Sequence, residues 1–159
     1  MAHVPPPYAG LIEASLELVA GRCEDPTPLV YERLFAAEPE LRTYFWRDTS
    51  GTIKGEMLSK VFEAILDFVG DRKYAHQLMT TEMITHEGYD VPREIFSTFF
   101  GIVAEAVAEI LADDWTPDLA AAWGALLAEI DGYLQVTPRS DVRTPAFPSY
   151  FERKAAAQA

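Results

Sequence analysis

Histidine is the side chain in this sequence best suited to coordinate a metal ion or to transfer a proton near neutral pH. There are three histidines: His3 in the proline-rich start of the chain, His76 early in a weakly helical stretch, and His86 at the end of that stretch. A histidine at a helix end is most often a capping or surface residue. Neither a His-Glu-x-x-His nor a Cys-x-x-Cys pattern occurs, which argues against a zinc site made of protein ligands alone.

The sequence around His86 is strongly apolar and aromatic. Large apolar residues follow it at Val91, Phe96, Phe99 and Phe100, and others precede it at Phe35, Phe45 and Trp46. Aromatic residues at helical spacing usually form a packed core. They also suit a flat apolar ligand inserted between helices, with His86 completing the coordination of its iron. The sequence has no Gly-x-Ser-x-Gly nucleophile motif and no glycine-rich phosphate loop.

Proline, glycine and apolar periodicity divide the chain into segments and predict an all-α fold of about seven or eight helices. The expected helices cover residues 8–22, 27–35, 39–45, 58–69, 74–85, 92–112 and 117–137. Residues 46–55 are polar and contain glycine, which predicts a loop that leads into a helix. Thr116 is the expected N-cap of the last long helix, and Pro138 is expected to end it.

Composition limits the partners and the location of the protein. The 159 residues suit one domain with a sizeable core, and the formal net charge is -12. Such an acidic chain repels the phosphate backbone of nucleic acids and an anionic membrane surface. We expect no membrane span, because no apolar run approaches the length that crosses a bilayer. With one cysteine, Cys23, and no secretory signal visible near Met1, the cytoplasm is the expected location.

Three regions are expected along the chain. Residues 1–7 form an extended lead-in that contains three consecutive prolines, and residues 8–137 form the helical domain. Residues 138–159 form a C-terminal extension outside the main core, partly disordered or docked on the surface.

Three blocks of sequence, in order and in register, resemble bacterial globins of the single-domain and flavohaemoglobin branch. Leu29–Phe45 is similar to the second and third helices of those globins, and His86–Pro92 is similar to their proximal-histidine turn. The third block begins at Phe100 and ends with Asp114–Gly124, which contains a helix-opening Thr-Pro pair and an Ala-Trp-Gly triplet. Together the blocks cover roughly residues 8–137. The resemblance implies a globin fold around a pocket for haem b, the iron protoporphyrin IX group.

The same resemblance implies roles for individual residues. His86 is the implied proximal ligand of the iron, and Tyr31 is an implied hydrogen-bond donor on the distal side. Phe45 is the aromatic residue that packs against the haem, and Val91 and Phe96 line its proximal side.

The distal helix departs from the family pattern. Matching its apolar residues places Lys54 at the distal polar position and Leu58 one turn later, whereas a second register places Met57 and Val61 there. The family commonly has glutamine or histidine at the polar position, and this sequence has neither there. Tyr31 is then the main donor to a bound ligand.

The proximal side departs from the pattern as well. Flavohaemoglobins have a tyrosine and a glutamate that hydrogen-bond the histidine and its surroundings, but in register these positions are Phe96 and, at or near it, Pro138. We expect a backbone carbonyl of the Glu82–Met83 turn to accept the imidazole N–H instead, and peroxidase-like O–O cleavage to be weak. The side chain of Glu82, one turn before His86, is the alternative acceptor.

The implied function is haem-based binding of O2, NO or CO, for oxygen binding or transport or for NO detoxification. About 22 residues follow the last globin helix, too few for a flavin-binding reductase domain. NO dioxygenase turnover would therefore need an external reductase, and enzymatic activity is left open. The alternative is a globin-type sensor or protein-interaction module without turnover, and a helical module without haem ranks behind both. The expected oligomeric state is a monomer or a homodimer.

Overall fold

The computed structural model describes residues 2–136 and 150–158, which fold as helices joined by short loops. These residues form α1 (Ala9–Arg22), α2 (Thr27–Ala37), η1 (Pro39–Phe45), α3 (Thr52–Val69), α4 (Ala75–Glu87), α5 (Glu94–Leu111), η2 (Ala112–Asp114), α6 (Pro117–Val136) and α7 (Tyr150–Ala157). Both η1 and η2 are short 3-10 helices. No strand occurs in the described ranges, so the predicted all-α class is confirmed.

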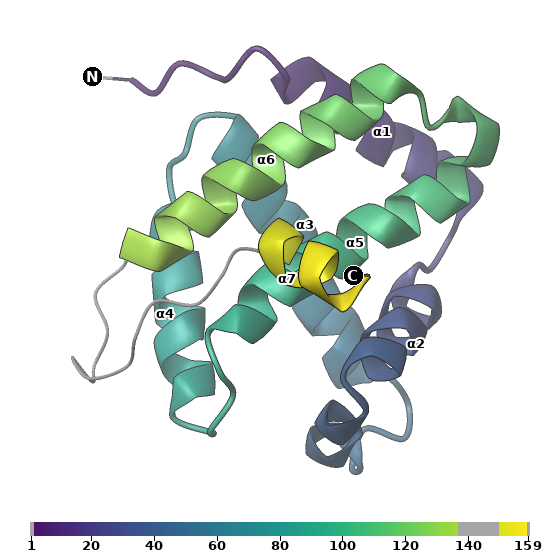
Figure 1. The fold of residues 1–159 in the computed structure, drawn as a ribbon, viewed down its shortest axis with the longest axis vertical. Helices are drawn as coiled ribbons and strands as arrows, with labels where there is room; N and C mark the ends of the chain where they lie inside the picture. The colour runs from purple at the N-terminus through teal and green to yellow at the C-terminus, as the bar shows by residue number, and fades with distance from the viewer. Residues whose placement is uncertain (1, 137–149, 159) are drawn as a thin grey trace.

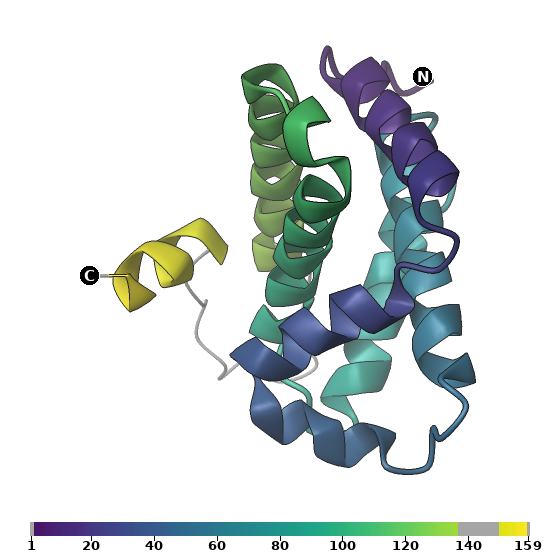
Figure 2. The same ribbon diagram turned by 90° about the vertical axis from the view of Figure 1, so that its right-hand side faces the viewer.

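The long helices form two sides with α2 across one end. In Figure 2, α5 and α6 stand together on one side, and α1 and α3 stand on the other. The helix α2 packs against both α5 and α3, while α4 packs against α3. Figure 1 shows that the α4–α5 corner and η1 lie at the same end of the molecule, with the first turns of α5 beside them. The residues that sequence analysis selected for a ligand site fall at this end.

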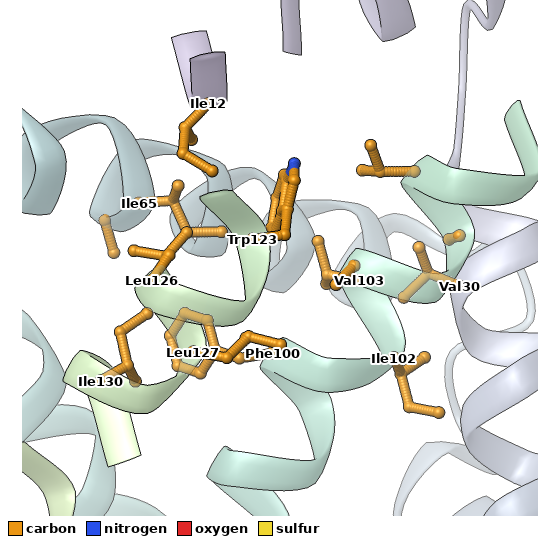
Figure 3. Packing of buried hydrophobic residues seen from close by; sticks show 14 of the residues in the cluster. Ile12, Val30, Ile65, Phe100, Ile102, Val103, Trp123, Leu126, Leu127 and Ile130 are labelled. Carbon is orange, nitrogen blue, oxygen red and sulfur yellow. The ribbon is translucent and has the colours of Figure 1, made fainter. Parts of the chain in front are cut away.

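Side chains from α1 to α6 and from η1 meet in one core. Figure 3 shows Ile12 of α1, Val30 of α2, Ile65 of α3, Phe100 of α5 and Trp123 of α6 in the shared interior. Trp123 of α6 is almost fully buried, and its indole N–H donates to the Ser15 hydroxyl at 3.0 Å. Ser15 in turn donates to the Ile12 carbonyl oxygen at 2.7 Å. These bonds matter because a buried polar group without a partner is costly.

The central helix corrects one expectation about membranes. Residues Glu94–Asp114 are long and apolar enough to cross a bilayer by length and composition, although we expected no such run. In the described part of the chain this is the one stretch of that kind, and 56% of its most apolar window is buried inside the protein. The reason is packing: α5 contacts α1, α2, α6 and α7, so apolar residues are needed on several of its faces.

A carboxylate fixes the start of α4, and a hydroxyl fixes the start of α6. The buried carboxylate of Asp67, near the end of α3, accepts hydrogen bonds from the backbone N–H groups of Lys73, Tyr74 and Ala75. It thereby holds the start of α4, the helix whose last turn contains His86. Thr116 accepts from the Leu119 N–H at 3.2 Å, as expected of the N-cap before α6.

Two helical segments differ from the sequence-based expectation. The helix α3 begins at Thr52, inside the stretch expected to be a loop. The helix α7 was not predicted, and it lies within the expected C-terminal extension. It is joined to α5 by Arg153, which donates to the Thr98 hydroxyl and the Glu94 carbonyl oxygen, and by an ion pair between Lys154 and Glu105. Pro138, expected to end α6, lies outside the described residues.

Candidate functional site

His86 lies in the last turn of α4 with a defined hydrogen bond on one ring nitrogen. Its Nδ1 is 2.7 Å from the Glu82 carbonyl oxygen, one helical turn earlier. A carbonyl oxygen only accepts, so Nδ1 carries the proton. The lone pair is then on Nε2, the nitrogen available to bind a metal. This carbonyl is the acceptor that the sequence analysis expected.

The turn after His86 is closed by backbone hydrogen bonds and by an ion pair. The N–H groups of Tyr89 and Val91 both donate to the His86 carbonyl oxygen, at 2.9 and 3.0 Å. Across the turn, Nε of Arg93 donates to Oε1 of Glu87 at 2.7 Å, and the Arg93 side chain is only 1% exposed. Arg93 also reaches the Leu134 carbonyl oxygen of α6 at 3.4 Å. A buried, paired guanidinium fixes this corner against α6, because breaking such a pair leaves a poorly solvated charge.

Two phenylalanines on α5 connect the histidine to a tyrosine on another helix. The ring of Phe96 meets the His86 imidazole edge to face, with centroids 5.1 Å apart. The ring of Phe99 lies 5.6 Å from the ring of Tyr31 in α2. Residues three apart on a helix are neighbours on its surface. His86 and Tyr31 therefore contact adjacent positions on the same stretch of α5.

Tyr31 is buried among aromatic rings and its hydroxyl has no partner. The residue is 2% exposed, and its ring packs against Phe35, Phe45 and Phe99 at centroid distances of 5.5 to 5.8 Å. Its buried hydroxyl oxygen makes no hydrogen bond to any protein group. Burial and, to a smaller extent, the nearby negative charge of Asp48 raise the pKa of Tyr31 far above its usual range. The phenol therefore keeps its proton at any ordinary pH and can donate a hydrogen bond to a bound molecule.

Lys54 lies near this tyrosine but is engaged by Asp48. Its Nζ is 3.2 Å from Oδ2 of Asp48 and 5.7 Å from the centroid of the Phe45 ring. Asp48 also accepts from the backbone N–H groups of Ile53 and Lys54, at 3.1 and 3.0 Å. It caps α3 in this way because the residue at the N-cap, Gly51, has a φ of 78° and no side chain.

The electrostatics of Asp48 follow from these contacts. Burial alone would raise the pKa of Asp48, but the two backbone N–H groups and the ammonium of Lys54 outweigh it and hold that pKa below the usual range. Asp48 is therefore ionised near neutral pH, and Lys54 has a fixed counter-ion.

The other residues expected on the distal helix are placed as follows. Leu58 is buried, and Met57 and Val61, the residues of the second register, are half-buried. Gly55 lies where α3 passes α2: a Cβ on it would come 3.8 Å from the Thr27 hydroxyl oxygen. The contacts bring Tyr31, Phe45 and Lys54 into one group on this side.

The second group is His86 and Phe96, and Val91 is buried and linked to His86 by its backbone N–H. The carboxylates around this group are held by other partners. Glu82 pairs with Lys60 of α3, and Glu87 pairs with Arg93. Buried Asp131 of α6 accepts from the Ser97 hydroxyl at 2.5 Å.

Sequence reasoning missed Asp48, Phe99 and Arg93 as parts of the site. Phe99 was noted as aromatic, but only its contact with Tyr31 shows which face of α5 it occupies. Asp48 caps N–H groups five and six residues ahead, which is longer than the usual cap spacing and gives no sequence signal. Arg93 directly precedes α5, and nothing in its sequence position indicates that its side chain is buried.

These observations define an all-helical protein with an imidazole and a buried phenol against one stretch of a central helix. A globin family model matches residues 29–134. The match spans most of the chain, which belongs to the globin family. No curated protein gave a match to this sequence. Globins typically bind haem, and through it gas ligands such as O2.

The residues present fit a haem. The Nδ1–H of His86 is taken by a carbonyl, which leaves Nε2 as the donor that haem iron requires. The buried hydroxyl of Tyr31 lacks a protein partner and is suited to a ligand bound on the other side. Within the described residues, no group of three His, Cys, Asp or Glu side chains is arranged to hold a metal ion.

Proposed function

We propose that this globin binds haem b through His86 and reversibly binds O2, with Tyr31 as the donor that stabilises it. One observation carries the proposal: the Tyr31 hydroxyl is buried, protonated and without a partner among protein groups. A donor in that state gains a hydrogen bond when a polar ligand arrives and gives up none. Haem supplies the iron to which a diatomic gas binds.

The chain's own residues divide the work. His86 supplies Nε2, the Glu82 carbonyl fixes the tautomer, and the Arg93–Glu87 pair holds the corner that carries the ring. Phe45 and Phe99 surround the phenol ring and exclude water from it. In a dry site a hydrogen bond to the ligand is stronger than in water. Lys54 is held by Asp48, so Tyr31 is the principal donor.

The proximal contacts bear on the chemistry that follows binding. A neutral imidazole that donates to a carbonyl gives less electron density than one paired with a carboxylate. We therefore infer weak peroxidase activity. We place the chain in the single-domain and flavohaemoglobin branch of the globins, with O2 storage, or NO dioxygenation supported by electrons from an external reductase, as its roles. NO and CO are the competing ligands.

Haem titration of the purified full chain tests the proposal. We expect a Soret band that saturates at one haem per chain, and a five-coordinate ferrous spectrum. His86→Ala should lose that spectrum and most of its haem retention. His76→Ala is the matched control, because His76 lies at the other end of α4, stacked on Tyr133, and should leave both unchanged. Absence of a Soret band would reject the proposal and favour an interaction module, whereas an unchanged His86→Ala spectrum would reject His86 as the iron ligand.

A further inference from the structure

A carboxylate lies beside the proximal imidazole without accepting its proton. Oε2 of Glu82 is 3.8 Å from Nδ1 of His86, which is too long for a hydrogen bond. The carbonyl oxygen of the same residue is 2.7 Å from Nδ1 and takes the bond. Nδ1 carries a single proton, so the carbonyl and the carboxylate of Glu82 compete for it.

Lys60 holds the second oxygen of that carboxylate. Its Nζ, on α3, is 3.5 Å from Oε1 of Glu82 on α4, and α3 packs along α4. The Lys60 side chain is 56% exposed and the Glu82 side chain 29%. An exposed pair of this kind shifts the balance between two side-chain arrangements only modestly, by up to about fivefold. A shift of this size changes which oxygen of Glu82 faces the imidazole in most molecules when the two arrangements are close in free energy.

We propose that Lys60 is a positioning residue that sets the electron donation of His86 by keeping the Glu82 carboxylate away from Nδ1. The proposal rests on the proposed haem function. With Lys60 in place, the imidazole donates to a neutral carbonyl. Without it, Glu82 at position i of an i, i+4 pair is free to turn to His86, and the ring gains imidazolate character. This chain therefore has a carboxylate beside His86, that of Glu82, and Lys60 keeps it from accepting the Nδ1 proton.

Resonance Raman spectroscopy of the ferrous haem-loaded full chain tests this directly. We expect Lys60→Met to shift the iron–histidine stretching band to higher frequency and to lower the midpoint potential. Lys73→Met removes the same charge from another exposed pair, with Asp71 in the loop before α4, and should leave the band in place. Lys60→Arg should behave as the unchanged protein, because arginine also pairs with Glu82.

A second set of variants separates the carboxylate from simple charge loss. In a Glu82→Gln background, Lys60→Met should no longer move the band, since the group it releases is absent. Raising the ionic strength should move the band of the unchanged protein toward that of Lys60→Met, because exposed pairs are screened by salt. A band that stays in place in Lys60→Met, or moves equally with and without Glu82, overturns the inference. Failure of haem to bind through His86 would instead reject the proposed function.

Discussion

The two sides of the α5 helix near the site differ in how their polar groups are satisfied. On the side of His86, the imidazole donates to Glu82, and the Glu87 carboxylate is bound to Arg93. On the side of Tyr31, the hydroxyl is buried and makes no hydrogen bond to protein. An unmade hydrogen bond at a buried hydroxyl costs about 1–3 kcal/mol. The polar groups on the side of His86 are thus held by partners, whereas the side of Tyr31 has a buried donor that we propose for a bound ligand.

The largest effect that we predict follows from breaking the Arg93–Glu87 ion pair on the side of His86. Glu87→Ala removes the 2.7 Å partner of a guanidinium that is 1% exposed. Breaking a buried pair by removing one partner is strongly destabilising, but Glu87 is partly exposed and Arg93 keeps its bond to Leu134. We expect the free energy of unfolding to fall by about 2–3 kcal/mol in urea denaturation. Glu24→Ala, an exposed change in the loop after α1, is the control, and equal stability of the two variants would contradict a rigid corner.

The next effect concerns the unbonded hydroxyl of Tyr31, and the sign of its contribution depends on whether O2 is bound. Tyr31→Phe removes the buried hydroxyl, so the ligand-free protein should gain about 1 kcal/mol of stability. In the O2 complex the same change removes a hydrogen bond, so the O2 dissociation rate should rise by roughly an order of magnitude. Flash photolysis and urea denaturation measure the two quantities. Tyr44→Phe, an exposed tyrosine in η1, should change neither. A loss of ligand-free stability in Tyr31→Phe would show that the hydroxyl already has a partner.

A smaller effect concerns the acid stability of the distal side. The pKa of Asp48 lies below its usual range in the folded protein because two backbone N–H groups and Lys54 favour the charged form over the opposing effect of burial. A lowered folded pKa gives stability that is present above the unfolded pKa of about 3.9 and is lost as the pH falls through the folded value. Melting temperatures from pH 6 to pH 2 should therefore fall less steeply in Asp48→Asn. Asp113→Asn in η2 is the control, and parallel curves for Asp48→Asn and the unchanged protein would count against this explanation.

The smallest effect sharpens the account of the proximal side. Phe96→Tyr restores the tyrosine that flavohaemoglobins have, but it supplies only one half of their tyrosine–glutamate pair. The nearby carboxylates Glu82, Glu87 and Asp131 are already held by Lys60, Arg93 and Ser97. We expect the iron–histidine band to remain where it is. A rise as large as that of Lys60→Met would mean that Phe96, and not Lys60, sets the electron donation of His86.

The sequence predicts the helices well and the polar contacts poorly. Helix starts at Pro39 and Pro117 were readable because proline favours a first turn. His86 was assigned from one turn and a family resemblance, and its Glu82 carbonyl partner follows from helix geometry alone. Contacts between distant segments were not readable. The Lys60–Glu82 pair depends on how α3 packs against α4, which no local pattern specifies. The Asp48 cap is local, but it spans five and six residues, which is longer than the usual cap spacing.

The helix α7 was missed because it is short. It has eight residues and ends in alanines after Arg153 and Lys154. The described contacts of Arg153 and Lys154 with α5 are polar and charged, through Thr98 and Glu105. A helix of this length contains too few residues for hydrophobic periodicity to be detected.

The burial of α5 on several faces has a consequence for how the chain is made. Its partners α1 and α2 precede it in the chain, but α6, which packs along it, follows it. During synthesis from the N-terminus, one apolar side of α5 therefore stays exposed to solvent until α6 has left the ribosome. An exposed surface of this kind attracts other chains. The yield of folded protein in the cell thus depends on how soon Pro117–Val136 emerges and packs against α5.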